Sequence, residues 1–467
     1  MSRFNFVFIG SFFLLISILS FLNIIYSYYF NLYLNLDTYV YTLIISLCIS
    51  ILLFIRKKVY YKNNIFDKIL VVISGYIFIP LVISIPYFLS IYNLTFIDCY
   101  FEAISGFTST GFTIFDNIKN IDESLVLWRS SSQWIGGLYF LFSLIILIDI
   151  FDNNLKDSFT EFSSFNISET LNQSLKVLIL YTFLTFLIFI LLKFVNIRNL
   201  DAFNLSLTLI SSGGFLSTNS LDQILNNDLK KIITSITMLF SFFSIFLFYN
   251  IVLNRSKKLN VFYEDFYLLI YLLFLIIIFF IFFNEQNNFP SLLLSIATTI
   301  SNIGFYLNDS NENMLFVYLI LVIIGGSFFS TSSGLRFIKL LALVKFSIND
   351  LLSHAKPKHV LLSKSILFFK IVEKKDLNKY FLSLIIFIIS MFMLTLLLTI
   401  TNINYSEAFR ISILTLMNTV NSSLFGLNDY NFNDINIFTK TILMFFMIIG
   451  RVELLTVLIL MKKFLSK

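Results

Sequence analysis

The sequence predicts an all-α polytopic membrane protein built around four pseudo-symmetric repeats. Hydrophobic residues make up 58% of its 467 residues and charged residues only 13%, which leaves too little polar surface for a soluble protein of this length. Apolar runs of about 20 residues, the length that crosses ~30 Å of hydrocarbon as a helix, recur along the whole chain. A short polar motif recurs between these runs, and its copies define the repeats.

The composition excludes several other classes of protein. Cys48 and Cys99 are the only cysteines, and His354 and His359 are the only histidines. The chain therefore has neither a disulfide framework nor the ligands of a Cys/His zinc site. Its net charge of +6 is concentrated in a few Lys/Arg clusters, as the positive-inside rule predicts for a membrane protein. No nucleic-acid partner is expected.

The first apolar segment begins at the N-terminus, with MSRFNFVFIGSFFLLISILSFLNIIYSYYF. It has one basic residue, an apolar stretch longer than that of a secretory signal, and no A-x-A cleavage pattern. We therefore expect a retained transmembrane helix, the first of an N-terminal pair at residues 1–60.

Ten apolar segments are expected to span the membrane, one of them interrupted. Lys/Arg clusters follow the second segment (RKKVYYK) and the sixth (NRSKK), run through residues 336–379, and end the chain (MKKFLSK). An even number of crossings separates each cluster from the next, so all lie on one face, which should be cytoplasmic together with both termini. The segments are approximately 5–30, 38–55, 68–92, 124–150, 174–195, 230–253, 264–283, 314–348, 380–401 and 436–461.

Four connections on the opposite face share one composition. Each contains an apolar run too short to span the membrane, then small polar residues and an Asn/Asp-rich tail, which favours a re-entrant loop. Four amphipathic extracellular loops are the alternative. The connections are roughly 93–123, 196–229, 284–313 and 402–435.

These connections contain the repeated motif, which aligns without gaps. The copies are TSTGFTIFD (108–116), SSGGFLSTN (211–219), SNIGFYLND (301–309) and NSSLFGLND (421–429). The fifth place is phenylalanine in every copy: Phe112, Phe215, Phe305 and Phe425. The fourth place is glycine in three copies and Leu424 in the last. The common unit is thus a span, a half-length helix, a polar Gly-Phe turn and a second span.

Such a unit is suited to binding a cation. Non-helical backbone at membrane depth is tolerated only where it is buried in protein or lines a water-filled path. Four turns around a pseudo-fourfold axis would point carbonyl oxygens inward, in place of a cation's hydration shell. Glycine provides the backbone angles that such a turn needs, and the negative end of each short helix would favour a cation.

Acidic residues near these turns would concentrate cations at the pore mouth. The alternative is that each is an ordinary solvated loop charge. The residues are Glu102, Asp116, Asp122, Glu123, Asp309 and Asp429.

The fourfold unit resembles the Trk/Ktr/HKT superfamily of potassium transporters over roughly residues 68–461. FEAISGFTSTGFT (101–113) resembles the family's first pore loop, and LWRSSSQWIGGLYF (127–140) the helix after it. GGSFFSTSSGLRFIK (325–339) resembles the interrupted second helix of the third repeat, although the family has more glycine there. MIIGRVELLTVLILM (447–461) resembles the Gly-Arg-Leu-Glu signature of the last helix. The extra N-terminal pair is similar to the longer, TrkH-like branch.

The break at 325–339 is physically tolerable only if it lines a cavity, and a merely kinked helix is the alternative. The resemblance implies an intramembrane gating loop just below the filter. Its expected gating residues are Gly325, Gly326, Ser330, Thr331 and Gly334.

Arg451 and Glu453 lie within an apolar helix, where ionisable groups are costly and usually functional. The resemblance implies that Arg451 lies near the gating loop, as an electrostatic barrier or gate partner. A snorkelling arginine is the alternative. Arg129, in the first turns of its helix, is expected to form a salt bridge at the outer interface rather than to contact ions.

We therefore expect a membrane potassium uptake protein, not an enzyme, with potassium as its ligand and no organic cofactor. The expected repeats are 61–160, 161–260, 261–376 and 377–467, after the helix pair at 1–60. The expected ion-binding residues are Thr108, Ser109, Thr110, Gly111, Ser211, Ser212, Gly213, Gly214, Ser301, Asn302, Ile303, Gly304, Asn421, Ser422, Ser423 and Leu424.

Partners and location follow from the resemblance. It implies a homodimer with one pore per protomer in the bacterial inner membrane, and a cytoplasmic nucleotide-binding regulatory subunit of the TrkA/KtrA type. The basic region 336–379 could dock that subunit or contact anionic lipid. The chain itself has no G-x-G-x-x-G or Walker motif, so any nucleotide is expected on the partner.

Two other hypotheses remain. Because Leu424 stands at a glycine position, where a left-handed backbone would cost roughly 1–2 kcal/mol, the chain could be a channel of altered K+/Na+ selectivity or a non-conducting relic. A membrane-embedded enzyme is disfavoured, because no cluster of His, Asp, Glu or Cys on adjacent spans supplies a nucleophile, base or metal site.

Overall fold

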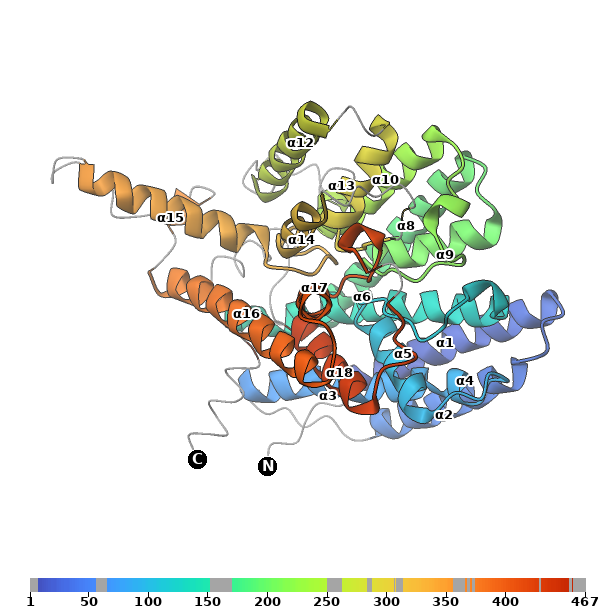
Figure 1. The fold of residues 1–467 in the computed structure, drawn as a ribbon. Coiled ribbons are helices and arrows are strands. Elements are labelled where there is room, and N and C mark those ends of the chain that lie inside the picture. Colours follow the sequence, from blue (N-terminus) through green and yellow to red (C-terminus); the bar gives the residue numbers. More distant parts are fainter. Residues whose placement is uncertain are drawn as a thin grey trace.

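Helices form most of the structure, a computed structural model of the chain (Figure 1). It describes residues 7–55, 65–151, 170–249, 263–283, 288–305, 307, 314–355, 366–367, 370–371, 374–427, 430–452 and 456. Seven helices of this described part are long and apolar enough to cross a membrane, so the chain is a multi-pass helical membrane protein, as predicted.

The N-terminal pair consists of α1 (Val7–Tyr29) and α2 (Leu36–Ile55). The two helices pack along each other at one edge of the molecule (Figure 1). The Ser20 hydroxyl lies 2.7 Å from both the Tyr39 carbonyl and the Thr42 hydroxyl. Polar side chains thus join two otherwise apolar helices, whose outer faces remain exposed.

Four repeats follow, each with a first helix, a half-length pore helix and a second helix. Repeat 1 has α3 (Ile65–Ile83) with α4 (Ile85–Phe88), α5 (Phe96–Phe107) and α6 (Glu123–Phe151). Repeat 2 has α8 (Thr170–Phe194), α9 (Asn199–Ile210), and α10 (Asp228–Phe242) with α11 (Ile245–Tyr249). Repeat 3 has α12 (Tyr263–Phe283), α13 (Phe289–Ile300), and α14 (Leu315–Ile323) with α15 (Phe337–Ala355). Repeat 4 has α16 (Lys374–Ile400), α17 (Tyr405–Leu416) and α18 (Ile437–Val452).

The remaining elements are short. Three 3-10 turns lie after the pore helices of repeats 1, 2 and 4: η1 (Ile118–Asn120), η2 (Leu221–Gln223) and η7 (Ser423–Phe425). Strands β1 (Ile366–Leu367) and β2 (Lys370–Ile371) pair antiparallel between α15 and α16.

The repeats close into a ring in chain order. Helix α6 of repeat 1 contacts α9 of repeat 2, and α10 contacts α13 of repeat 3. In the same way α14 contacts α17 of repeat 4, and α18 contacts α5 of repeat 1. Loops of repeats 2 and 4 therefore face each other across the axis, as do those of repeats 1 and 3.

Two of the ten predicted spans leave the helix in the middle, and a third is described only in part. The break in 314–348 was expected, and residues 324–336 do leave the helix there, so a merely kinked helix is excluded. The break in 230–253, at Phe243 and Ser244, was not expected. The segment 436–461 is described only to residue 452 and at 456.

The predicted repeat boundaries near 60, 160 and 260 lie outside the described residues. The boundary at 376 falls within the first turn of α16.

Candidate ion pore

The four pore helices have the same length and end in the same way. Each has 12 residues and is followed by a C-cap and then a residue with positive φ. The C-caps are Thr108, Ser211, Ser301 and Met417. The left-handed residues are Ser109 (φ 57°), Ser212 (54°), Asn302 (57°) and Asn418 (48°). One backbone turn thus occurs four times around the ring.

Hydrogen bonds fix this turn in every repeat. The N–H of the residue after the left-handed one donates to a carbonyl five residues earlier in its pore helix. The pairs are Thr110 to Ser105 (2.9 Å), Gly213 to Thr208 (2.8 Å), Ile303 to Thr298 (3.0 Å) and Thr419 to Leu414 (3.0 Å). We call the four residues after each pore helix loop 1 (108–111), loop 2 (211–214), loop 3 (301–304) and loop 4 (417–420).

This geometry corrects the predicted register of the fourth copy by four residues. The loop that matches the other three is 417–420, whereas the predicted stretch Asn421, Ser422, Ser423 and Leu424 follows it and enters η7. The sequence alignment was anchored on Phe425 and Asp429, but repeat 4 has four extra residues between its helix end and that phenylalanine. The counterpart of the glycine at the fourth place is therefore Val420, and Leu424 is a buried residue of η7.

The fourth place of the loops takes two backbone conformations. Gly111 and Gly304 have φ of 79° and 74°, whereas Gly214 and Val420 have no positive φ. The N–H groups of Gly111 and Gly304 return to their own pore helices. The N–H of Val420 instead donates to the Ile303 carbonyl of loop 3, at 3.3 Å. Loop 4 thus avoids the strain expected of a β-branched residue in a left-handed conformation.

The second place separates the loops into two pairs. Asn302 donates through Nδ2 to the Val322 carbonyl (2.8 Å) and to the Thr419 hydroxyl (3.4 Å). Asn418 donates through Nδ2 to the Met447 carbonyl and to the Thr110 hydroxyl, both at 2.9 Å. Each asparagine therefore ties its loop to the second helix of its own repeat and to the next loop of the ring.

The serines at the second place of loops 1 and 2 make different contacts. The Ser109 hydroxyl accepts a hydrogen bond from Arg451 Nη2 at 3.4 Å. The Ser212 hydroxyl lies 3.4 Å from the hydroxyl of Thr331. Loops 1 and 2 therefore contact the elements beneath the ring, which the sequence predicted to form a gate.

The intramembrane loop (residues 324–336) is folded around Arg336. Its ends pair through Gly325 N–H to the Leu335 carbonyl at 2.9 Å, and Gly334 supplies a φ of 83°. Arg336 Nη1 donates to the carbonyls of Ser327 and Ser332, both at 3.0 Å, and to the Ser330 hydroxyl at 3.2 Å. Broken backbone at membrane depth is thereby hydrogen-bonded within the protein, as the hydrocarbon requires.

The predicted gating residues of this loop lie against the ring. Thr331 donates to the carbonyl of Ile210, the last residue of pore helix α9, at 2.7 Å. The Gly326 N–H donates to the Ser332 hydroxyl, which lies 2.8 Å from the Ser330 hydroxyl. Gly325 has no room for a Cβ, because the Ser333 carbonyl lies 2.3 Å from where that atom would be.

Arg451 joins the intramembrane loop to the ring. It is 1% exposed, and its guanidinium lies over the Phe140 ring with 4.2 Å to the centroid. It donates to the Ser333 hydroxyl and, at 3.5 Å, to the Ser211 carbonyl. The expected proximity of Arg451 to this loop is present, and a snorkelling arginine is excluded. Glu453, predicted beside it, lies outside the described residues.

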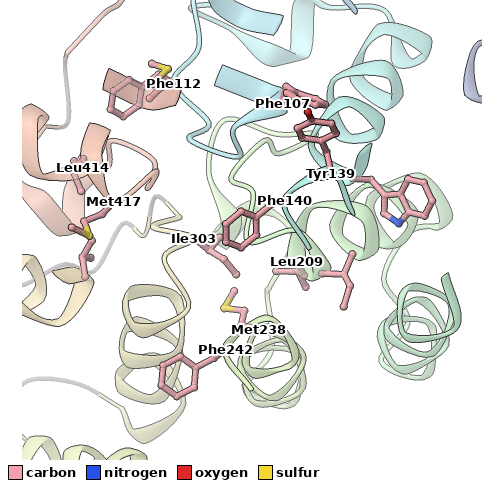
Figure 2. Packing of buried hydrophobic residues seen from close by; sticks show 14 of the residues in the cluster. Phe107, Phe112, Tyr139, Phe140, Leu209, Met238, Phe242, Ile303, Leu414 and Met417 are labelled. Carbon is pink, nitrogen blue, oxygen red and sulfur yellow. The ribbon is translucent and has the colours of Figure 1, made fainter. Parts of the chain in front are cut away.

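The Phe140 ring contacts the guanidinium groups of both Arg336 and Arg451. The Arg336 guanidinium is 5.0 Å from its centroid, so this ring contacts two cations. Figure 2 shows Phe140 among labelled core residues from all four repeats, including Leu209, Ile303 and Met417. An aromatic face stabilises cations in a dry interior.

Arg129 and Glu102 form a buried ion pair, with 2.8 Å between Nε and Oε1 and exposures of 1% and 0%. The predicted salt bridge of Arg129 is present, but in the protein interior rather than at the outer interface. Glu102 also accepts hydrogen bonds from the Thr113 hydroxyl and the Ile114 N–H. Its predicted position at a solvated mouth is therefore wrong, because all of these groups bury it.

The other predicted acids are distributed differently. Asp116 is exposed and accepts a hydrogen bond from Asn431. Asp122 and Glu123 are partly exposed. Asp309 and Asp429 lie outside the described residues.

Sequence reasoning missed a contact between the break in repeat 2 and the intramembrane loop. The Ser327 N–H donates to the Phe242 carbonyl at 3.0 Å, and the Ile245 N–H to the Phe329 carbonyl at 3.2 Å. Glu264 and Asp265 of α12 hold the two sides, accepting from the N–H groups of Phe328 (2.8 Å) and Ser244 (3.0 Å). The adjacent acids Glu264 and Asp265 at the start of an apolar span were the feature of the sequence that could have indicated this contact.

A second repeated motif was also missed. Ile-Gly-Gly occurs at 135–137 and 324–326, and Ile-Gly-Arg at 449–451. A Cβ on Gly136 would lie 1.9 Å from the Phe107 carbonyl, and one on Gly450 would lie 2.4 Å from the Leu416 carbonyl. Phe107 and Leu416 both end pore helices, so these glycines let second helices approach the ring, and Arg451 occupies the position of Gly137.

The four loops contain no charged side chain, so their oxygen atoms belong to backbone carbonyls, hydroxyls and one amide each in loops 3 and 4. Within the described residues, no group of three or more His, Cys, Asp or Glu gathers as a metal site. A ring of such oxygens is the chemistry of a selectivity filter.

Proteins of similar sequence are cation transporters. TrkG, a Trk system potassium uptake protein of Escherichia coli, is 25% identical over 419 residues, which are 85% of each chain. TrkH of Escherichia coli is 25% identical over 399 residues, 79% of each chain. An uncharacterized cation transporter of Methanocaldococcus jannaschii is 25% identical over 357 residues, 74% of this chain and 72% of the relative. The chain is a homologue of Trk-family membrane subunits.

The fold agrees with that of a Trk-family structure. The crystal structure of the potassium transporter TrkH from Vibrio parahaemolyticus matches with a TM-score of 0.81 at 20% identity, covering 97% of this chain and 98% of that one. No family model matches the chain. The resemblance to Trk-family subunits and the fold class predicted from the sequence are confirmed, and these relatives are transporters rather than enzymes.

Proposed function

We propose that this protein is the membrane subunit of a potassium uptake system, passing K+ through the centre of the four loops. The observation that carries this proposal is the turn repeated at 108–111, 211–214, 301–304 and 417–420. The same left-handed turn ends each of the four pore helices, and the repeats contact one another in chain order around a ring. The negative ends of the helices and the carbonyl oxygens together favour a dehydrated monovalent cation. The names of TrkG and TrkH point to potassium.

The intramembrane loop and Arg451 form the proposed gate. Together they close the space beneath loops 1 and 2, where Arg451 places a positive charge in the path of a cation. A cation passing this level must overcome that charge in a low-dielectric interior, where electrostatic interactions are strong. Movement of the intramembrane loop would withdraw the Ser333 and Thr331 contacts.

The proposed assembly is a homodimer with one pore per protomer in the bacterial inner membrane, with cytoplasmic termini. A nucleotide-binding subunit of the TrkA/KtrA type would dock on the side that carries the basic region 336–379. Helix α15 extends beyond the helix bundle (Figure 1) and carries exposed apolar residues such as Leu351, which fits a docking role. The repeat boundaries 61–160, 161–260, 261–376 and 377–467 are part of this proposal.

Uptake by cells tests the proposal. A bacterial strain lacking its own potassium uptake systems is transformed with the full chain and grown at limiting potassium, and uptake of a rubidium tracer is measured. Growth and saturable rubidium uptake are expected, and excess potassium but not sodium should compete. Uptake that sodium suppresses equally would instead support a channel of altered K+/Na+ selectivity. A well-expressed protein without any uptake would contradict the proposal and favour the relic.

A further inference from the structure

Val420 lies on the axis of the ring. Its Cγ2 is 1.7 Å from the position that a Cβ on Gly214 would occupy, and 2.4 Å from that on Gly111. Loop 2 is opposite loop 4, so a loop 4 side chain that reaches Gly214 must cross the centre.

The same residue also contacts loop 3. The Val420 carbonyl oxygen is 2.9 Å from the position of a Cβ on Gly304, and its N–H donates to the Ile303 carbonyl. Val420 therefore touches all three other loops at one level. The carbonyl of Ile303, which could otherwise face a cation, is occupied by this hydrogen bond.

The glycines of loops 1 and 2 provide the space for this side chain. Gly111 and Gly214 are themselves close, since the Cβ position of Gly111 lies 3.3 Å from the Gly214 backbone nitrogen and Cα. A single isopropyl group fills the volume that two missing side chains leave. An apolar group in that volume offers no oxygen to a cation that has lost its water.

The level of Val420 is the outer end of the loops. Arg451, which contacts the second place of loop 1, lies 14 residues into α18, or about 21 Å from the face where α18 begins. After the second place, each loop returns toward that face, so the fourth place, which is Val420 in loop 4, lies nearer to it. Val420 is partly exposed there, whereas Gly111, Gly214 and Gly304 are buried.

We propose that Val420 is a steric plug that closes the outer end of the ion path and sets the rate and selectivity of passage. The proposal rests on the proposed function. A cation passes only when loop 4 moves aside, which breaks the hydrogen bond between Val420 and Ile303. The protein should therefore transport more slowly than the same chain with a fourth glycine.

The test compares potassium-dependent rubidium influx into liposomes containing the full-length protein, with matched variants at two positions. Val420→Ala and Val420→Gly shorten the plug, and Leu424→Ala makes the same kind of truncation at the position that the sequence alignment selected. Influx is expected to rise severalfold with V420A and at least about tenfold with V420G. L424A should remain within about twofold of the original chain.

A labelling measurement does not depend on transport. In a background with Cys48→Ser and Cys99→Ala, which removes one exposed and one buried thiol, Val420→Cys is treated with a membrane-impermeant thiol reagent. Reaction from the face where the pore helices begin is expected. A thiol that does not react from that face overturns the assigned position.

The possible results distinguish failure of the plug proposal from failure of the proposed potassium transport. Equal, measurable influx in the original chain, V420A and V420G overturns the plug and leaves potassium transport intact. An equal gain from L424A and V420A also overturns it, because the effect would not be specific to the axis. Absence of influx in every form, with V420C labelled and the proteins monodisperse, contradicts potassium transport and the plug together.

Discussion

The two halves of the ring use the same backbone turn but are braced differently. Loops 1 and 2 carry Ser109 and Ser212, which contact Arg451 and the intramembrane loop. The buried Arg129–Glu102 pair holds Thr113 and Ile114, which follow loop 1. The Arg129 guanidinium also lies 4.1 Å from the Phe215 ring centroid, so it joins loop 1 to loop 2. Loops 3 and 4 carry asparagines that brace the loops directly. One side chain at an equivalent position thus decides whether a loop contacts the gate or its neighbour.

The largest expected effect comes from breaking the brace of the first half. Glu102→Gln leaves the Arg129 charge buried without its partner, which costs about 3–5 kcal/mol. We expect the melting temperature of the purified protein in detergent to fall sharply and expression to decrease. The double variant E102Q/R129Q removes the uncompensated charge and should recover part of the loss. A single variant as stable as the original chain would show that this pair does not brace the first half.

The brace of the second half is weaker because it uses neutral hydrogen bonds. Asn418→Gly keeps a residue suited to positive φ but removes the bonds to Thr110 and Met447. Leaving buried groups without partners costs about 1–3 kcal/mol, so a smaller fall in melting temperature is expected than for E102Q. Ser109→Gly is the matched control in the first half. Its long contact to Arg451 should make the change in melting temperature smaller still, and equal losses from both would erase the distinction between the halves.

The contact between the first half and the gate is tested at Arg451. Among the described residues, Arg451 donates to hydroxyls and a carbonyl and to no carboxylate, and in the proposed function its charge repels cations below the loops. Arg451→Gln should raise resting rubidium influx about tenfold, which corresponds to about 1.4 kcal/mol. Ser333→Ala removes one hydrogen bond while keeping the charge, so it separates the two contributions. If S333A leaks as much as R451Q, the hydrogen bond rather than the charge closes the gate.

The smallest effect is expected at the exposed ion pair of Glu123 and Arg198, whose side chains are 38% and 64% exposed. The hydrogen bond from Arg198 to Glu123 raises the pKa of the arginine further, but solvent screens such pairs. Glu123→Gln should therefore change stability by no more than about 0.5 kcal/mol. A fall in melting temperature comparable to that of E102Q would show that burial does not distinguish the two pairs.

The first three loops could be predicted from the sequence because glycine and phenylalanine mark them at fixed distances. Thr108, Ser211 and Ser301 follow their pore helices as the alignment placed them. The fourth loop could not be predicted, since Val420 looks like an ordinary strand or helix residue and Phe425 offered a better match four residues later. The end of the pore helix at Leu416, the positive φ of Asn418 and the Thr419–Leu414 hydrogen bond identify the register.

The sequence also could not show which acidic residue is buried or which distant groups form hydrogen bonds with each other. Glu102 reads as a loop acid because an isolated carboxylate near a turn gives no sign of its partner, which lies 27 residues away. The break at Phe243 and Ser244 has no glycine or proline to mark it. Its backbone groups are satisfied by Asp265 and by the intramembrane loop, and such long-range partners appear only when the chain is folded.

The sequence by itself determined that the chain crosses a membrane repeatedly, that four repeated helix–loop–helix units form one fold, and that residues near 325–339 break a span. These properties depend on hydrophobic run length and on residues with special backbone angles, which are local. Tertiary structure decided which residue of loop 4 contacts the other loops, which acid is buried, and which loops contact Arg451 and the intramembrane loop. Those properties depend on what lies across the ring, and an apolar valine becomes a candidate plug only because two glycines face it.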